Sequence, residues 1–157
     1  MALRANAKKN AMTSGLTYGL ALGTKVLTLD GELPVEFLEP GDRILTRSGS
    51  RRLISVEVSL VKNARMMRVG ASTLGRERPE EDVLLPAAQP VLVRDWRAKA
   101  MAGSSQAMIP ISRLADGEFI RGEIVAEVRL FALAFEEEVV VYAGGLELVC
   151  PKEAIRL

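Results

Sequence analysis

The sequence predicts an all-β domain built from short strands, with at most short helices near residues 95–101 and 151–155. Two observations lead to this class: apolar residues occur in many short runs, and turn-forming residues separate those runs. A third is that evidence for helices is confined to two short segments. With 48% hydrophobic and 26% charged residues, the composition is that of a folded globular protein.

The first residues of the chain differ from the rest. Residues 1–15 are small, polar and cationic, and they show no period that would bury one face. We therefore expect a flexible N-terminal tail over residues 1–15 and a single β domain over residues 16–157, since 157 residues is the length of one domain.

The strands are predicted from their apolar and β-branched residues. They cover residues 25–29, 33–37, 42–46, 52–61, 66–69, 91–93, 118–120, 126–135 and 139–142. Between the first two, Asp30 and Gly31 predict a tight hairpin, because aspartate followed by glycine tolerates the positive φ of a type I′ turn. The segment 139–142 is continuously apolar, which indicates a strand buried on both faces.

The two helical segments are short. Residues 95–101 could form two turns, and Pro151 could occupy the first turn of a final helix over 151–155, where proline's missing N–H is harmless. A chain so dominated by short strands and turns is expected to form a β-sandwich or barrel.

Composition and charge exclude several functions. The 21 basic and 20 acidic residues give a net charge of +1, which provides no overall attraction to nucleic acid or anionic lipid. The chain contains no histidine, the usual general acid or base near neutral pH and the commonest metal ligand. Phosphate-binding loops, metal-ligand spacings and dinucleotide fingerprints are also absent, so we expect no cofactor and no metal.

The number of cysteines and the lengths of the apolar runs predict the cellular location. The single cysteine, Cys150, excludes an intrachain disulfide and favours a reducing compartment. Polar residues interrupt the apolar core that an N-terminal signal peptide would need, and no run approaches 18 apolar residues. We expect a cytoplasmic protein without a membrane span.

Two segments near the N-terminus carry a resemblance to a known family. Residues 23–31 and 34–46 contain a glycine-threonine entry, a strand, a glycine turn and then proline-glycine-aspartate before a second strand. This order resembles the opening of a bacterial Hint (hedgehog/intein) domain. Residues 85–98 are similar to the family's central block, and residues 116–120 with 139–144 to its closing half. The resemblance implies a pseudo-twofold, horseshoe-like arrangement of short strands.

The resemblance also implies an activity that can be compared with the residues present. Hint domains begin self-cleavage by an acyl shift, in which a cysteine or serine attacks the preceding carbonyl and an acid protonates the departing amide nitrogen. The nucleophile position corresponds to Gly19, and the central-block histidine to Gln89. The hydroxyl three residues earlier corresponds to Pro86, and a further histidine to Glu138.

None of these replacements supports the chemistry. Glycine has no side chain to attack with, glutamine does not titrate, and proline lacks both a hydroxyl and an N–H. The sequence therefore predicts that the chain is not an enzyme. We expect Gln89 to keep a hydrogen bond inside the former site, because a buried amide without partners is costly.

Three functions remain open from the sequence. The first is an inactive domain that serves as a protein-interaction or structural module for another protein or peptide segment. The second is residual self-cleavage around residues 17–24, with Thr17 or Thr24 as a weak nucleophile. The third is a small ligand-binding β-barrel with a superficial resemblance to the family. Cys150 is expected to be a packed thiol, because no histidine is available to lower its pKa.

One short basic cluster is a candidate partner surface. Arg94, Trp96 and Arg97 place two cations beside the only tryptophan, a combination that could bind an acidic partner or a phosphate. A solvated face is the alternative interpretation, because short clusters in a chain of balanced charge are usually exposed to solvent. Nucleic acid is not expected as the partner.

Overall fold

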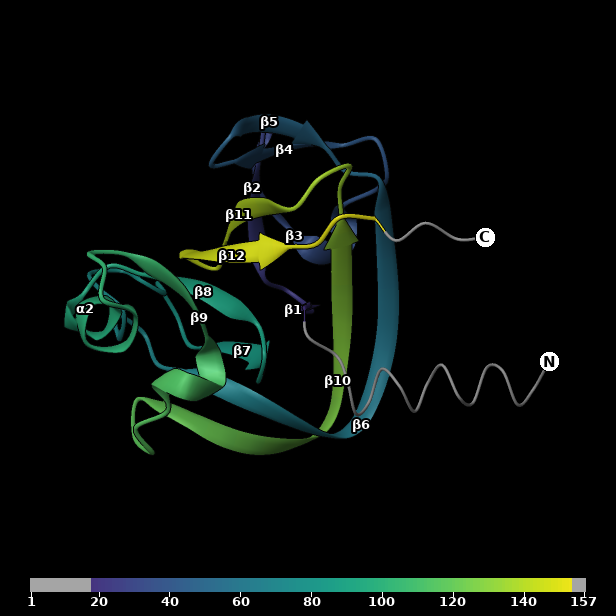
Figure 1. Cartoon of the computed structure of the whole chain (residues 1–157). Helices are drawn as coiled ribbons and strands as arrows, with labels where there is room; N and C mark the ends of the chain where they lie inside the picture. The colour runs from purple at the N-terminus through teal and green to yellow at the C-terminus, as the bar shows by residue number, and fades with distance from the viewer. Residues whose placement is uncertain (1–17, 154–157) are drawn as a thin grey trace.

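The computed structural model describes residues 18–153, which form two antiparallel sheets (Figure 1). The predicted tail over residues 1–15 lies outside the described residues. The smaller sheet has the order β1 (Leu20–Ala21), β10 (Ile120–Ala134), β6 (Ser55–Val69) and β7 (Val83–Pro86). The larger has the order β3 (Gly31–Pro34), β2 (Lys25–Thr28), β4 (Arg43–Thr46), β11 (Val139–Ala143), β12 (Leu146–Cys150), β8 (Pro90–Val93) and β9 (Ala107–Pro110), with β5 (Gly49–Arg52) paired to β4.

Two long strands form the frame of the molecule. β6 and β10 each have 15 residues and pair with each other along nearly their whole length. Figure 1 shows them curving together along one side of the molecule and beneath it. The sequence had predicted two separate strands in each, at 52–61 and 66–69 and at 118–120 and 126–135. Those interruptions were wrong, because the polar residues between the apolar runs lie on exposed faces while backbone pairing continues past them.

The two halves of the domain are built alike, which confirms the pseudo-twofold arrangement. The β2–β3 hairpin leads into a short 3-10 helix, η1 (Val35–Phe37), and the β8–β9 hairpin leads into η2 (Ile111–Leu114). Val35 donates its N–H to the carbonyl of Thr24 at 2.8 Å, and Ile111 donates to the carbonyl of Gln89 at 2.9 Å. Thr24 and Gln89 therefore occupy corresponding positions in the two halves.

Several local predictions need correction. Residues 35–37 form η1 instead of extending a strand, and β1, β5, β7, β9 and β12 were missed. The predicted type I′ turn is wrong, because only Gly31 has positive φ, after Leu29 and Asp30. The turn is fixed by Thr28, whose hydroxyl donates to the Gly31 carbonyl at 2.8 Å and accepts from the Asp30 N–H at 3.0 Å.

One predicted helix is present and the other is not. α2 (Trp96–Ala102) is capped by the Asp95 carboxylate, which accepts from the Arg97 N–H, and it ends at Gly103, whose φ is 69°. Residues 151–153 of the predicted final helix are instead extended, because their backbone bonds to Phe135: its N–H donates to Pro151 and its carbonyl accepts from Glu153. The remainder of that segment lies outside the described residues.

One hydrophobic core joins the two sheets. Its largest fully buried side chains come from both halves of the chain: Ile44, Leu53, Leu85, Ile111, Ile120, Leu133, Phe135, Leu146 and Leu148. The strand predicted at 139–142 is present as β11, and its residues alternate between buried and half-buried. Because β12 is buried along its whole length next to β11, it holds the centre of the larger sheet in place.

Candidate functional site

The residues that correspond to the family's reaction site meet at a buried amide. Gln89 follows the tight turn between β7 and β8, where its N–H donates to the Pro86 carbonyl at 3.0 Å. Its side chain is 1% exposed. Oε1 accepts from the backbone N–H of Gly19 at 3.1 Å, and Nε2 donates to the carbonyls of Pro90 at 3.1 Å and Val149 at 2.9 Å. The expected hydrogen bond of Gln89 is thus confirmed.

These contacts fix the direction of the hydrogen bond to Gly19. Two carbonyl oxygens face one end of the Gln89 carboxamide, so that end carries the NH₂ group and the oxygen faces Gly19. The Gly19 nitrogen is the atom that would leave in an acyl shift at the bond after Tyr18. Gln89 Oε1 accepts a hydrogen bond from the N–H of that nitrogen and carries no proton to donate to it, and Gly19 has no side chain to act as a nucleophile.

The other predicted positions divide into two groups. Pro86 is buried at the end of β7, and its carbonyl positions Gln89. Glu138 is exposed on the loop between β10 and β11, and no hydrogen bond or ion pair of its side chain occurs within residues 18–153. The structure therefore brings Gly19, Pro86 and Gln89 together and leaves Glu138 outside. Thr17 lies outside the described residues.

Cys150 lies close to this site, but its thiol is buried and protonated. It is the last residue of β12, adjacent to Val149, and its side chain is buried. Removal from water disfavours the thiolate and raises the pKa of Cys150 to about 12. The thiol is therefore protonated at neutral pH, which agrees with the interpretation of a packed side chain.

We expect the Cys150 thiol to resist modification in the folded protein. At pH 8 a disulfide reagent such as Ellman's should react at least about a hundredfold more slowly with native protein than with protein in denaturant, since burial limits both access and thiolate. Because the pKa is raised on folding, the thiol's stabilising contribution is complete below pH 9 and is lost as pH rises toward 12. Cys150→Ala should therefore show a shallower alkaline loss of stability. Equal reaction rates in the two states would contradict the buried placement.

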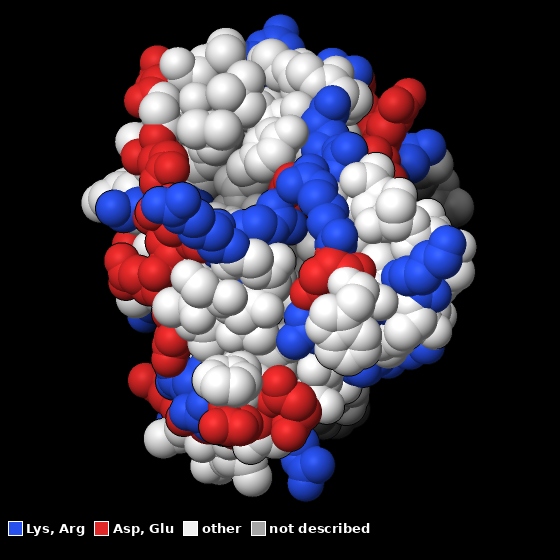
Figure 2. Space-filling model, turned by 90° about the vertical axis from the view of Figure 1, so that its left-hand side faces the viewer, with Lys and Arg blue, Asp and Glu red and all other residues white. Residues whose placement is uncertain are grey.

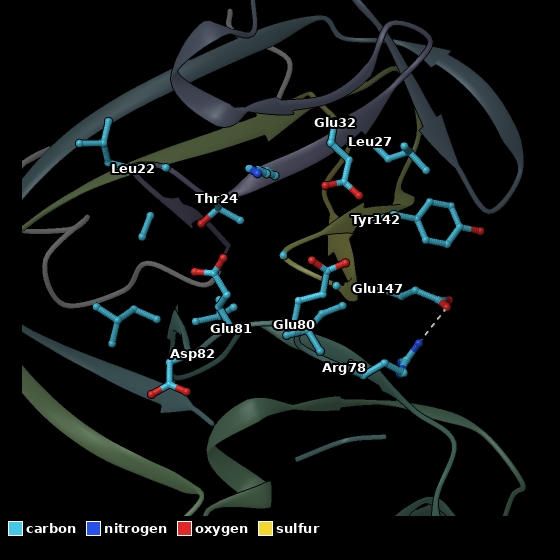
Figure 3. Close-up of a pocket in the computed structure, with 18 of the residues that line it drawn as sticks. Leu22, Thr24, Leu27, Glu32, Arg78, Glu80, Glu81, Asp82, Tyr142 and Glu147 are labelled. Atoms are coloured by element: carbon cyan, nitrogen blue, oxygen red, sulfur yellow. Dashed lines mark hydrogen bonds and ion pairs between the residues drawn. The ribbon is translucent and has the colours of Figure 1, made fainter. Parts of the chain in front are cut away.

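A cavity of about 450 Å³ opens beside the N-terminal side of this site. Apolar side chains of Leu22 and Leu27 line it with Thr24 and Tyr142, and the carboxylates of Glu32, Glu80 and Glu81 point into it (Figure 3). Leu22 lies only three residues after Gly19 in the chain. The lining of the cavity therefore combines apolar and charged side chains.

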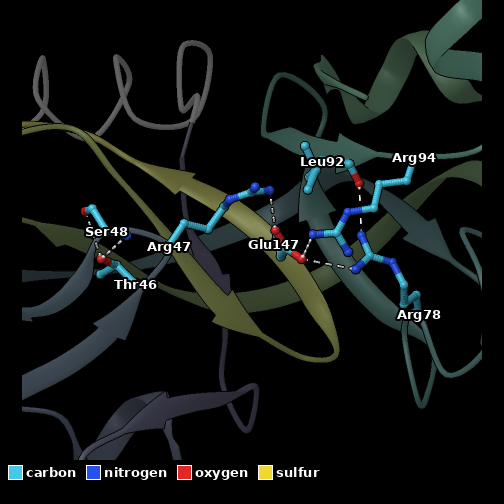
Figure 4. Close-up of polar contacts among 7 residues, drawn as sticks. All are labelled: Thr46, Arg47, Ser48, Arg78, Leu92, Arg94 and Glu147. Atoms are coloured by element: carbon cyan, nitrogen blue, oxygen red, sulfur yellow. Dashed lines mark hydrogen bonds and ion pairs between the residues drawn. The ribbon is translucent and has the colours of Figure 1, made fainter. Parts of the chain in front are cut away.

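Where β12 borders this cavity, the buried carboxylate of Glu147 forms ion pairs with three arginines (Figure 4). Glu147 is 4% exposed. Its Oε2 accepts from Arg47 Nη1 at 2.9 Å, and its Oε1 accepts from Arg78 Nη1 at 3.3 Å and Arg94 Nη2 at 2.6 Å. We call these four residues the arginine cluster. Sequence reasoning missed it, although a lone glutamate within the apolar strand β12 was a signal that a buried charge needs partners.

The predicted partner surface is only partly available for contacts. Arg94 belongs to the arginine cluster, while Trp96 is 72% exposed at the start of α2. Arg97 has partners within the chain: it pairs with Asp95, donates to the Thr73 carbonyl at 3.4 Å and lies over the Trp96 ring at 5.3 Å. Arg97 therefore positions Trp96, and only Arg94 and Trp96 face outward.

The described part of the chain contains neither a metal-binding cluster nor a membrane-spanning helix. No group of three or more cysteine, aspartate or glutamate side chains in residues 18–153 is arranged to hold a metal ion. None of the helices in these residues has the length and apolar character needed to cross a membrane.

Comparison with known proteins places the chain in a family. The Hint domain family model matches residues 18–149. The solution structure of a bacterial intein-like domain from Clostridium thermocellum is similar over 86% of this chain and 99% of its own, with 14% identity and a TM-score of 0.63. The TvoVMA intein (85% and 97%, 12% identity, TM-score 0.60) and the gp41-1 intein (83% and 97%, 15% identity, TM-score 0.54) are also similar. No curated protein sequence matches the chain. Since the family model covers most of its length, the chain belongs to the Hint domain family.

Proposed function

We propose that this Hint domain is catalytically inactive and serves as a protein-interaction or structural module, whose partner is another protein or a peptide segment. The observation that carries the proposal is the buried hydrogen bond from the Gly19 N–H to Gln89 Oε1 at 3.1 Å. In this bond, the amide that a Hint reaction would break donates its N–H to Gln89. The reaction would instead need a side chain that donates a proton to that nitrogen.

The chemistry of the acyl shift explains why this contact matters. The reaction needs a side-chain nucleophile on the residue after the scissile bond and a proton for the departing nitrogen. Gly19 has no side chain, and the oxygen of Gln89 is an acceptor. Cys150 is protonated and buried in β12, so it offers no substitute thiolate. The retained core and the cavity beside β1 leave a folded surface for binding.

Intact mass spectrometry of the freshly expressed full chain tests the proposal. We expect one full-length species, with and without added thiol, and the same species after days at elevated pH. A fragment that ends at Tyr18 would refute inactivity, and so would a fragment that ends at Gly23, where the Thr24 hydroxyl could attack the preceding carbonyl.

The missing groups can also be restored together. We expect the triple variant Gly19→Cys, Pro86→Thr, Gln89→His to undergo cleavage after Tyr18 within hours in the presence of thiol, because it regains a thiol nucleophile and a titrating acid on the same backbone. Gel electrophoresis and mass spectrometry would quantify the fragments. The matched control carries Gly19→Ala with the same two other changes and should stay intact. Equal cleavage of both variants would show that residue 19 does not supply the nucleophile.

A further inference from the structure

The arginine cluster contains more positive charge than its carboxylate neutralises. Arg47, Arg78 and Arg94 contribute three positive charges around the single negative charge of Glu147. They come from the β4–β5 turn, the β6–β7 loop and the end of β8, so three separate segments deliver them to one place. Figure 2, which views the side where α2 and the β11–β12 turn lie, shows lysine and arginine side chains in a continuous stretch across this face.

The three arginines differ in how far they are buried. Arg78 has the least exposed side chain, at 19%, and it also donates to the Leu92 carbonyl at 3.1 Å. Arg47 and Arg94 are 36% and 46% exposed. Within residues 18–153 each of their guanidinium groups makes one hydrogen bond, to Glu147, although a guanidinium carries five N–H donors. Arg47 and Arg94 therefore present unused donors to solvent.

The arrangement of these donors favours a second anion. Arg47 and Arg94 bind different oxygens of the same carboxylate, so two like charges flank one small group (Figure 4). A further carboxylate placed over them would offset their repulsion and accept charge-assisted hydrogen bonds in the paired geometry that arginine prefers. Trp96 lies two residues from Arg94 with its ring exposed and steadied by Arg97, which adds an apolar contact next to the charge.

We infer that Arg47, Arg94 and Trp96 form a docking site for an acidic peptide segment, in which a carboxylate lies on the two arginines and an apolar side chain lies on the tryptophan. This inference rests on the proposed function, because it names the chemistry of the partner of an interaction module. A nucleic acid is the weaker match, because a net charge of +1 provides no basic surplus along which a chain of phosphates could bind.

The test is selection from a random 12-residue peptide display library on the immobilised full chain. The best peptide would then be synthesised with a fluorescent label and titrated by fluorescence anisotropy. We expect the selected peptides to be rich in aspartate and glutamate next to an aromatic or aliphatic residue. Their binding should weaken with added salt, because the contacts are partly exposed ion pairs.

Matched variants distinguish binding at Arg47 and Arg94 from a general effect of the protein's positive charge. Arg47→Gln with Arg94→Gln should lower affinity at least about tenfold, whereas Arg65→Gln with Arg129→Gln, the same charge change on exposed strand positions, should alter it less than about twofold. If the double glutamine variant disturbs folding, Arg47→Lys with Arg94→Lys is the alternative, because it keeps two positive charges next to Glu147. That pair should still lower affinity several-fold at an unchanged melting temperature, because lysine lacks the planar fork. Trp96→Ala should lower affinity as well.

Several results of these binding measurements would overturn the inference. The inference is overturned if no peptide is selected, if the selected peptides are not acidic, or if the arginine variants bind as the parent does. It is also overturned if a 12-nucleotide single-stranded RNA or inorganic phosphate displaces the peptide at lower concentration than a free acidic peptide does. Failure of the proposed function would instead be seen as cleaved chains in the intact-mass measurement, which does not depend on any of these results.

Discussion

Glu147→Gln is expected to lower the free energy of unfolding by about 3 kcal/mol. The carboxylate is buried and is bound by Arg47, Arg78 and Arg94, so removing its charge leaves three guanidinium groups without a counterion. Breaking a buried ion pair on one side is costly because the remaining charge stays desolvated. The value lies at the lower end of the range for such changes, because Arg47 and Arg94 are partly exposed and solvent screens them. Urea unfolding followed by circular dichroism would measure it.

A less buried carboxylate in the same protein provides the control. Arg68 and Glu123 form a pair whose side chains are 26% and 33% exposed, so Glu123→Gln should cost under about 1 kcal/mol. Sulfate should stabilise Glu147→Gln more than the parent protein, because an added anion binds the uncompensated arginines of the folded state. A loss for Glu147→Gln no larger than for Glu123→Gln would show that the arginine cluster contributes little to stability.

Gln89→Leu is also expected to cost about 3 kcal/mol or more. Leucine fills a similar volume but cannot hydrogen-bond, so the Gly19 N–H and the carbonyls of Pro90 and Val149 would lose their side-chain partner in a buried site. Denaturant unfolding would measure the loss. Hydrogen exchange followed by NMR should in addition show faster exchange at the Gly19 amide, because β1 has only two residues to hold this end of the chain in the sheet.

Gln106 supplies the matched control for that change. It is an exposed glutamine in the segment between α2 and β9, so Gln106→Leu should change stability by less than about 0.5 kcal/mol. Unchanged exchange at Gly19 in Gln89→Leu would argue against the buried hydrogen bond. That result would also remove the main support for the proposal that this amide is held and not cleaved.

The two sites are joined through one strand. β12 supplies the Glu147 side chain to the arginine cluster and, two residues later, the Val149 carbonyl to Gln89. Because β12 is buried along its length between β11 and β8, the strand is held in place between its neighbours.

Local signals in the sequence predicted much of the fold. The all-β class followed from short apolar runs between turns, and α2 was predicted as a short helical segment over residues 95–101. The structure shows in addition that Asp95 caps this helix. One available signal was missed: a proline, an aliphatic residue, a leucine four residues after the proline, and a glycine followed by an acid occur in the same spacing from Pro34 and again from Pro110. These two copies lead into η1 and η2 and mark the two halves.

The sequence by itself also determined the absence of the reaction groups, because a missing nucleophile or histidine needs no coordinates to be seen. Tertiary structure alone decided what the replacements do. The bond between Gly19 and Gln89 joins residues 70 apart in the chain, and the ion pair between Arg47 and Glu147 joins residues 100 apart. Turns and caps depend on neighbouring residues, so the sequence indicates where they lie, although the type of the turn at Asp30 and Gly31 was predicted wrongly. Contacts between distant segments depend on how the strands pair and which faces they bury, and only the folded chain fixes those.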